Sequence, residues 1–235
     1  MGLLLKDSAP SCLKISISPI IKDGLVLYLP LYSGFCQNSP IKSREGLAHL
    51  CTVTGATWGP TGRIFDGDDD WLTIPATSTQ LDFTSSDFTI IMRLKLDLVG
   101  PARKDLFSAG MYICTGYEFV IEADGSFRLR TNQSGAAQHT NSAAGAVTTD
   151  TWYTLGVSRA TGATATHVYR NGVDATATTQ SMLNPVSATI VRKVGGYYDS
   201  AVYEIDGIVS DVLAYNRSLS AGEHMDIHNC LSWRV

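Results

Sequence analysis

One stretch near the end of the chain, Ile208–Tyr215, constrains the fold more than any other. It reads as one long strand with apolar residues on both faces: Ile208, Val212 and Ala214 on one, and Val209, Leu213 and Tyr215 on the other. A strand that is apolar on both faces lies in the middle of a sheet rather than at its edge. Because this strand comes late in the sequence, earlier parts of the chain must supply its neighbours. The sequence therefore predicts a single domain held together by long-range strand pairing.

The residues around this strand indicate how it begins and ends. Asp206–Gly207 predicts a turn before the strand, and the polar pair Asn216–Arg217 predicts a break after it. A short helix is expected over Ala221–Asn229. Ser220 is its expected N-cap, because Glu223 stands three residues later and completes a capping box.

The clearest strand pattern elsewhere is Phe88–Leu96, where apolar residues alternate with mostly polar ones. This alternation predicts a strand with one face in the core and the other more polar. Further strands are expected at Leu25–Leu31, Leu47–Val53, Arg63–Phe65, Trp71–Ile74, Asp105–Ala109, Glu118–Glu122, Ser126–Thr131, Trp152–Arg159, Thr164–Arg170, Val173–Thr178 and Ile190–Gly195. About a dozen strands fit two stacked antiparallel sheets.

Two connections stand out in this pattern. Asn171–Gly172 is the strongest hairpin signal in the chain, because both residue types accept the positive φ angles of a tight turn. The segment Asn132–Thr149 is rich in Gly, Ala, Ser and Gln and poor in large side chains. We expect it to be a mobile loop.

The first 22 residues are expected to form an arm, and residues 23–235 the domain. Pro10 and Pro19 interrupt the arm, and Leu13, Ile15 and Ile17 alternate with polar residues, as in an edge strand. Its apolar run is too short for a signal peptide, so we interpret it as a retained segment. The arm is expected to pair with a sheet edge or with another subunit.

Composition argues against several classes of partner. The net charge is −4, which provides no general attraction for nucleic acid. No apolar run approaches the roughly 20 residues of a membrane-spanning helix. The five cysteines are odd in number and lack the spacing of a metal site, so we interpret them as buried free thiols.

The closing run Gly207–Ser220 resembles the end of laminin G-like domains, which have the concanavalin A-like jelly-roll fold. Other segments that match this family in order are Gly24–Leu31, Phe65–Ile74, Phe88–Leu96, Trp152–Leu155 and Tyr169–Gly172. The resemblance covers residues 23 to 229. It implies an all-β, two-sheet antiparallel jelly-roll sandwich (concanavalin A-like) with one short C-terminal helix. It says little about function, because this fold carries lectins, enzymes and structural modules.

Enzymes of this fold carry alternating acids on one strand, and Glu204 and Asp206 match part of that pattern. The place of the general acid is taken by Ile208 or Val209, which cannot protonate a leaving group. We therefore expect no catalysis, and Glu204 is expected to be solvated beside a turn. Glu118 or Glu122 on another strand remain candidates for a distant acid.

The acidic loop Asp66–Asp70 offers the oxygen ligands that calcium prefers. Domains that resemble this chain often hold one calcium ion. We predict a structural calcium site with Asp68, Asp69 and Asp211 as ligands, where Asp211 matches an acidic position of the family's last strand. The alternative is a solvated acidic loop that protects a sheet edge.

Aromatic side chains are the expected recognition residues, because sugars place their apolar C–H faces against such rings. The candidate ligand-binding residues are Trp58, Trp71, Tyr197, Tyr198 and Asp199. For Trp58 and the tyrosine pair, plain packing remains an equal alternative.

Three functions stay open on this basis. The first is a non-catalytic module for glycan binding or adhesion. The second is a structural, decoration or receptor-binding protein of a phage-like virion, which assembles through the arm. The third is a glycoside hydrolase or polysaccharide lyase, which the missing acid disfavours. The first two imply an extracellular or virion-surface location.

Overall fold

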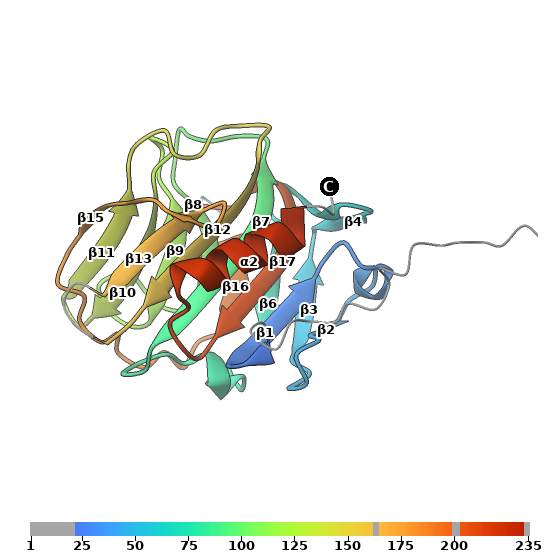
Figure 1. The fold of residues 1–235 in the computed structure, drawn as a ribbon. Helices are drawn as coiled ribbons and strands as arrows, with labels where there is room; N and C mark the ends of the chain where they lie inside the picture. The colour runs from blue at the N-terminus through green and yellow to red at the C-terminus, as the bar shows by residue number, and fades with distance from the viewer. Residues whose placement is uncertain (1–21, 162–164, 199–202, 233–235) are drawn as a thin grey trace, which may run out of the picture.

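The computed structural model describes residues 22–161, 165–198 and 203–232, which form two stacked antiparallel sheets (Figure 1). The eight-stranded sheet has the order β14 (Val173–Asp174), β13 (Thr166–Arg170), β12 (Trp152–Arg159), β7 (Phe88–Leu96), β17 (Asp206–Tyr215), β5 (Gly62–Asp66) and β4 (Thr57–Gly59), and β1 (Leu25–Pro30) also pairs with β17. The nine-stranded sheet has the order β15 (Thr176–Thr179), β11 (Ala136–Ser142), β10 (Phe127–Gln133), β9 (Tyr117–Ile121), β8 (Lys104–Ser108), β16 (Arg192–Val194), β6 (Trp71–Ile74), β3 (Leu50–Thr54) and β2 (Ile41–Lys42). The architecture is the jelly-roll sandwich that the sequence predicts.

β17 lies in the middle of its sheet, as predicted. β7 pairs along one side of it, and β5 and then β1 pair along the other. The strand begins at Asp206, so the predicted turn at Asp206–Gly207 is wrong. Gly207 is needed inside the strand, because a Cβ atom there would lie 2.2 Å from the carbonyl oxygen of Lys95 on β7.

A β-bulge at Ser210 changes which side chains of β17 face the core. Val209 pairs with Leu94 and Asp211 pairs with Arg93, so Ser210 is an extra residue. Val209 therefore shares the core face with Val212, and the predicted division of faces is wrong at this end of the strand. The bulge lies where the partner on one side changes from β5 to β1.

The core fills the space between the sheets. On β7 the inward side chains include Ile90, Met92 and Leu94, and the facing row on the other sheet includes Phe107 and Phe119. These residues are fully buried. Burial of such side chains is the main favourable contribution to folding.

The helix α2 (Ala221–Ser232) lies across the outer face of the eight-stranded sheet (Figure 1). A second apolar cluster forms beneath it, which consists of Leu25, Tyr28, Ile91, Leu213, Tyr215, Leu219, Ile227 and Leu231. The outer face of β7 is therefore also buried, and Lys95 alone on that strand keeps partial exposure. This face carries the more polar side chains of β7, as predicted, among them Thr89, Arg93 and Lys95, but most of it is buried.

The predicted capping box at the start of α2 is confirmed. The Glu223 backbone N–H donates to Ser220 Oγ (3.3 Å), and the Ser220 N–H donates to Glu223 Oε2 (2.8 Å). Arg217 also donates to Glu223 at 2.7 Å. This ion pair and the Ser220 hydrogen bonds are why the pKa of Glu223 falls to about 2. The helix continues three residues beyond the predicted end at Asn229.

The expectation of a mobile loop over residues 132–149 is wrong. This segment contains β11, which pairs with β10 from Arg128–Asn141 to Gln133–Ala136. β11 lacks large apolar residues because hydrogen bonds hold its buried positions; Thr140 Oγ1, for example, bonds to Thr179 Oγ1 at 2.6 Å.

The predicted strand Val173–Thr178 divides, so that β14 completes the hairpin with β13 and β15 joins the other sheet. The tight turn at Asn171–Gly172 is confirmed, with φ of +53° and +79°.

The predicted arm lies outside the described residues apart from Lys22, so its role in assembly stays a prediction. None of the helices in the described ranges combines the length and hydrophobicity that a membrane crossing requires.

His224 holds α2 to the sheet and generates a prediction about pH. Its ring stacks on Tyr169 at 3.7 Å between centroids, and its Nε2 bonds to Ser158 Oγ at 2.7 Å. Burial lowers the pKa of His224 from 6.5 to about 3, so the folded protein keeps the ring neutral. The unfolded chain takes up a proton below about pH 6.5, so this residue should cost stability as the pH falls, by up to about 1.4 kcal/mol per pH unit.

We expect His224→Gln to lower the free energy of unfolding at pH 7.5 and to lose this part of the pH dependence. The difference in the free energy of unfolding between wild type and His224→Gln should then become smaller as the pH falls towards 4. Urea unfolding across this range measures this difference, and His167→Gln, at a half-exposed histidine beside Asp174, is the control. If the free energies of unfolding of wild type and His224→Gln change in parallel with pH, burial of neutral His224 does not cause the pH dependence.

Candidate functional site

The outer face of the nine-stranded sheet carries a row of polar residues that crosses the strands. Successive strand pairs place the following residues directly opposite one another: Thr73, Lys193, Ser108, Glu118, Arg130 and His139. The neighbouring row, which includes Phe107, Phe119 and Leu129, faces the core. Because side chains alternate along a strand, the polar row lies on the outer surface of the sandwich.

Two arginines and two carboxylates form the centre of this face. Arg130 donates to Glu118 at 2.8 Å, and Asn132 donates to the other oxygen of Glu118 at 3.2 Å. Arg103 lies 3.1 Å from Asp105 and 3.8 Å from Glu118. These contacts fix the planes of both guanidinium groups.

Asp105 and Glu118 are fully buried beneath the arginines. Burial raises the pKa of Asp105 to about 7, and the Glu118 charge adds to this, although Arg103 acts in the opposite direction. A buried charge is retained only when partners compensate it. The two carboxyl groups therefore serve to hold Arg103 and Arg130 in place.

Three tyrosine rings lie against these arginines. The Arg103 guanidinium lies 4.0 Å from the Tyr203 ring centre and 5.1 Å from that of Tyr197, and Arg130 lies 4.7 Å from that of Tyr112. We call Tyr112, Tyr197, Tyr203, Arg103 and Arg130 the tyrosine–arginine cluster. Tyr112 is 49% exposed, so the cluster presents a ring to solvent.

A hydrogen bond ties two loops of the cluster together. The Tyr112 N–H donates to the hydroxyl of Tyr197 at 2.8 Å. Burial raises the pKa of Tyr197 to about 12, so its hydroxyl stays protonated at neutral pH. Cation–π contacts of this kind contribute about 0.5–1 kcal/mol each when exposed and more when desolvated.

The loop that carries Tyr112 is shaped by local backbone contacts. Gly110 and Gly116 pack so closely that a Cβ atom on Gly110 would lie 2.0 Å from the carbonyl oxygen of Thr115. Ile113 has a positive φ of 50°, and its N–H donates to the Asn132 side chain at 3.2 Å. The loop is therefore held against β10 with Tyr112 at its outer edge.

The structure brings some of the predicted ligand-binding residues to this face. Tyr197 belongs to the cluster, and the Tyr198 ring packs edge-on against it at 5.1 Å. Trp71 lies on the same sheet, with the Lys193 ammonium 3.9 Å from its ring centre. Trp58 lies apart on β4 of the other sheet, where its Nε1 donates to the Ser33 carbonyl at 3.2 Å. Asp199 lies outside the described residues.

Sequence reasoning did not assign Arg103, Asp105, Tyr112, Arg130 or Tyr203 to a site. The sequence did contain a signal for one contact of this site, that between Arg130 and Glu118. The hairpin over Asp124–Gly125 joins β9 to β10 and fixes their register, which places Arg130 opposite Glu118. Arg103 and Tyr203 lie in loops, and the hydrophobic periodicity of the sequence does not predict the path of a loop.

The predicted calcium ligands do not come together as one set. Oxygens of Asp66, Asp69 and Asp70 lie within 4.8 Å of one another, and Asp68 is not part of this group. Asp211 lies five residues along β17 from Asp206, which pairs with Asp66, a distance of roughly 16 Å at the usual strand rise. Its oxygens bond instead to Tyr28 (3.4 Å) and Ser210 (2.7 Å).

Glu204 differs from its expected state. It was expected to be solvated, but the residue is only 1% exposed. Neither of its carboxylate oxygens has a hydrogen-bond partner among the described residues. Burial raises its pKa to about 7, and the negative charges of Asp68, Asp69 and Asp70 add to this, although Lys193 acts in the opposite direction.

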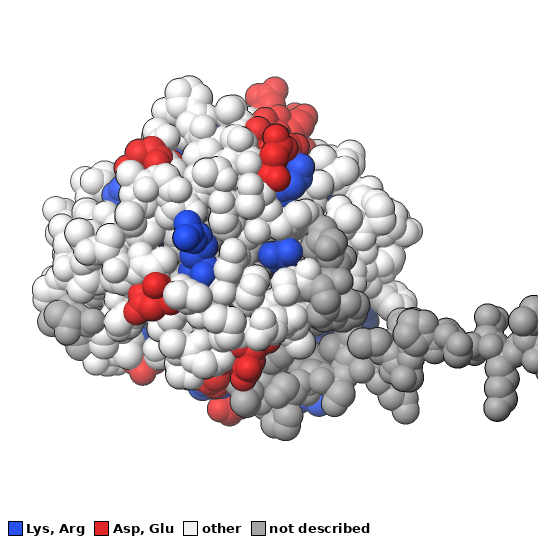
Figure 2. All heavy atoms as spheres, turned by 45° about the horizontal axis from the view of Figure 1, so that its top comes forward, with Lys and Arg blue, Asp and Glu red and all other residues white. Residues whose placement is uncertain are grey.

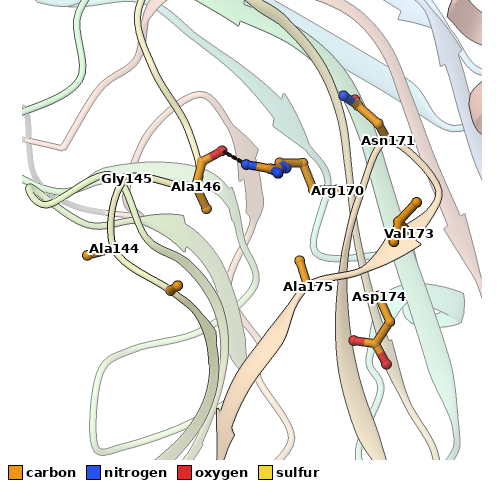
Figure 3. Close-up of a pocket in the computed structure, with 9 residues that line it drawn as sticks. Ala144, Gly145, Ala146, Arg170, Asn171, Val173, Asp174 and Ala175 are labelled. Atoms are coloured by element: carbon orange, nitrogen blue, oxygen red, sulfur yellow. Dashed lines mark hydrogen bonds between the residues drawn. The ribbon is translucent and has the colours of Figure 1, made fainter.

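A separate open hollow of about 510 Å³ lies between the turn at 143–146 and the β13–β14 hairpin (Figure 3). Arg170 crosses one side of it and donates to the Ala146 carbonyl at 2.9 Å (Figure 3). The residues that line it are mostly small, and none is aromatic. The hollow therefore lacks the rings that favour sugar binding.

Charge on the face shown in Figure 2 is sparse, with small acidic and basic groups among mostly uncharged atoms. That face shows no broad basic surface of the kind that nucleic acid requires.

Comparisons with known proteins agree with this architecture. The sequence matches the family model described as the concanavalin A-like lectin/glucanases superfamily over residues 66–223. Because the match covers more than half of the chain, the chain belongs to this superfamily. No curated protein sequence matches it.

Solved structures with a similar fold share little sequence with this chain. Botulinum neurotoxin type C, whose cell entry depends on two ganglioside molecules, matches with a TM-score of 0.66 and 12% identity, over 90% of this chain and 52% of that chain. The binding domain of botulinum neurotoxin DC in complex with SialylT matches with a TM-score of 0.66 and 11% identity, over 90% of this chain and 52% of that chain. A sialidase of Trypanosoma rangeli matches with a TM-score of 0.66 and 17% identity, over 90% of this chain and 33% of that chain. This chain thus spans about half of the neurotoxin chains and a third of the sialidase, and the likeness shows the fold alone.

The buried charges of the cluster generate a prediction about stability. Glu118→Gln keeps the shape of the side chain but removes the charge that compensates Arg130 and Arg103. We expect a loss of about 3 kcal/mol in the free energy of unfolding, as for other broken buried ion pairs. Glu122→Gln is the matched control, since Glu122 also contacts Arg130 but is 22% exposed. It should cost under about 1 kcal/mol.

Urea unfolding of both variants measures these losses. Equal losses would mean that the Glu118 charge does not hold the arginines in place.

Proposed function

We propose that this protein is a non-catalytic glycan-binding module and that the glycan lies on the outer face of the nine-stranded sheet. The observation that carries the proposal is the tyrosine–arginine cluster, in which rings and guanidinium groups are held in place before any ligand arrives. Ordering these side chains in advance lowers the entropy cost of binding. Membership in a superfamily of lectins and glucanases supports the proposal, and so do fold neighbours that interact with gangliosides or SialylT.

The chemistry of the face suits a sugar. Tyr112 and Trp71 offer apolar ring surface for the C–H face of a pyranose. Lys193, His139 and the arginine edges offer hydrogen-bond donors for hydroxyl groups along the same row. The polar row crosses six strands, or roughly 24 Å at the usual strand spacing, which leaves room for several sugar units.

Burial of the carboxyl groups argues for binding rather than hydrolysis. A glycosidase acid or nucleophile must reach the glycosidic bond. Asp105 and Glu118 are fully buried beneath Arg103 and Arg130, where a bound sugar does not contact them. Glu204 is also buried, and the general-acid position after it holds apolar residues.

Removing the exposed ring should weaken binding. We expect Tyr112→Ala to raise the Kd for a glycan selected on an array by about tenfold, which corresponds to about 1.4 kcal/mol. Phe35→Ala is the matched control, because Phe35 is also exposed and has Arg44 over its ring at 4.5 Å, but it lies in η2 (Gly34–Cys36), away from the cluster. Isothermal titration calorimetry with both variants measures the effect.

An unchanged Kd in Tyr112→Ala, or an equal loss in Phe35→Ala, would contradict the proposed location. The same glycans should stay intact on long incubation. Release of oligosaccharide by wild type would instead favour a glycoside hydrolase.

A further inference from the structure

A second hollow, of about 350 Å³, lies beside β1, the first strand of the domain. One wall consists of the connection between β2 and β3 with the first residue of β3, and the other is the segment that follows β6. The residues that line the hollow are Leu47, Ala48, His49, Leu50, Pro75, Thr77, Ser78 and Gln80. No Trp, Tyr or Phe is among these described residues, so the hollow lacks the rings that favour sugar binding.

Two leucines leave apolar surface in this hollow. Leu47 is 47% exposed and Leu50 is 54% exposed. Exposed leucines are common on protein surfaces when they stand singly, but these two share one concave site. The hollow therefore offers a place where an apolar segment can be buried.

Hydrogen bonds hold the wall that carries Leu47. Glu45 accepts the Tyr28 N–H at 2.9 Å and the Ser43 hydroxyl at 2.7 Å. The Ser43 N–H in turn donates to the His49 carbonyl at 3.0 Å. These contacts fix the connection between β2 and β3 against β1.

The facing wall is held in a similar way. The Ser78 N–H donates to the Pro75 carbonyl, and the Leu81 N–H donates to the Ser78 carbonyl, both at 3.0 Å. The Tyr117 hydroxyl donates to the Leu81 carbonyl at 2.8 Å. Both walls are therefore in place before anything binds, which lowers the entropy cost of filling the hollow.

The N-terminal arm joins the domain beside this hollow. His49 Nε2 donates to the Val26 carbonyl at 3.0 Å, and Val26 is four residues after Lys22, the end of the arm. An extended chain covers about 3.4 Å per residue, so the steps from Ile17 to Lys22 span up to about 17 Å. This length allows the arm to turn back from Lys22 and reach the hollow.

The arm also has an apolar pattern that suits the hollow. Leu13, Ile15 and Ile17 stand at alternate positions, so an extended segment places all three on one face. That face would cover the apolar surface of Leu47 and Leu50. A tether this short gives an effective concentration on the order of millimolar. The arm of the same chain is therefore favoured over the arm of a second copy.

We propose that residues 13–17 of the arm pack into this hollow of their own domain, against Leu47 and Leu50. The site is neither a second subunit nor the hydrogen-bonding edge of a sheet, the two partners that the sequence pattern of the arm suggests by itself. The hollow shares no residue with the tyrosine–arginine cluster, so this packing is independent of glycan binding.

Trypsin cleavage of the full chain tests this packing. Lys6 and Lys14 are cleavage sites in the arm, but only Lys14 lies within the packed segment. A bond inside a packed segment is cut only after that segment leaves the domain. We expect cleavage after Lys14 to be at least about tenfold slower than in a synthetic peptide of residues 1–22, whereas cleavage after Lys6 should match the peptide. Mass spectrometry over time measures both rates.

Variants locate the packed segment on the hollow. Leu50→Ser should speed cleavage after Lys14 by about five- to tenfold, because the arm would bury about half of the leucine side chain. Ile17→Ser should act in the same direction, and combining the two changes should add little, because the two side chains contact each other. Leu183→Ser is the matched control, since Leu183 is also 54% exposed but lies beside Gln133, away from the hollow. It should leave the rate as in wild type.

Three results would overturn the proposal. The first is cleavage after Lys14 in the wild-type protein at the rate of the peptide. The second is the same protection of Lys14 in Leu50→Ser as in wild type. The third is protection that appears only as the protein concentration rises through the micromolar range, because the arm would then bind a second copy.

Discussion

The pairing of β17 with three other strands is the constraint on which the rest of the structure depends. One strand near the end of the chain joins β7 on one side to β5 and β1 on the other, so the sheet is complete only when most of the chain is in place. Its inner face fills the core, and α2 covers its outer face. α2 therefore covers part of the outer face of the eight-stranded sheet, and the proposed glycan site lies on the outer face of the other, nine-stranded sheet.

Strands that bury large apolar side chains could be predicted from the sequence. Phe88–Leu96 and Trp152–Arg159 have the predicted bounds, because period-two patterns of large side chains leave one arrangement that fills the core. β11 was not predicted, because hydrogen bonds such as that of Thr140 hold it, and they leave no hydrophobic pattern. The bulge at Ser210 was missed because one extra residue reverses the alternation, and nothing local marks it.

The candidate site was predictable only in part, for a similar reason. Trp71 stood out as an aromatic residue beside the acidic loop, and Tyr197 as one that follows two glycines. Arg103 and Asp105, in contrast, can be assigned to the site only from their proximity to Glu118 on another strand. Buried ion pairs depend on register and loop paths, which sequence alone does not give. The buried carboxylates of Asp105 and Glu118 are stabilised by their contacts with Arg103 and Arg130. We infer that these contacts hold the proposed recognition surface rigid.

The most direct test of the account is hydrogen–deuterium exchange with and without a glycan selected on an array. Exchange reports protection along the whole backbone, so it locates the binding face without mutation. Glycan binding at the tyrosine–arginine cluster should slow exchange within residues 103–118 and 128–139, the strands and loop beneath the cluster, and leave α2 unchanged. Protection confined to α2, or to the hollow beside Arg170, would contradict it.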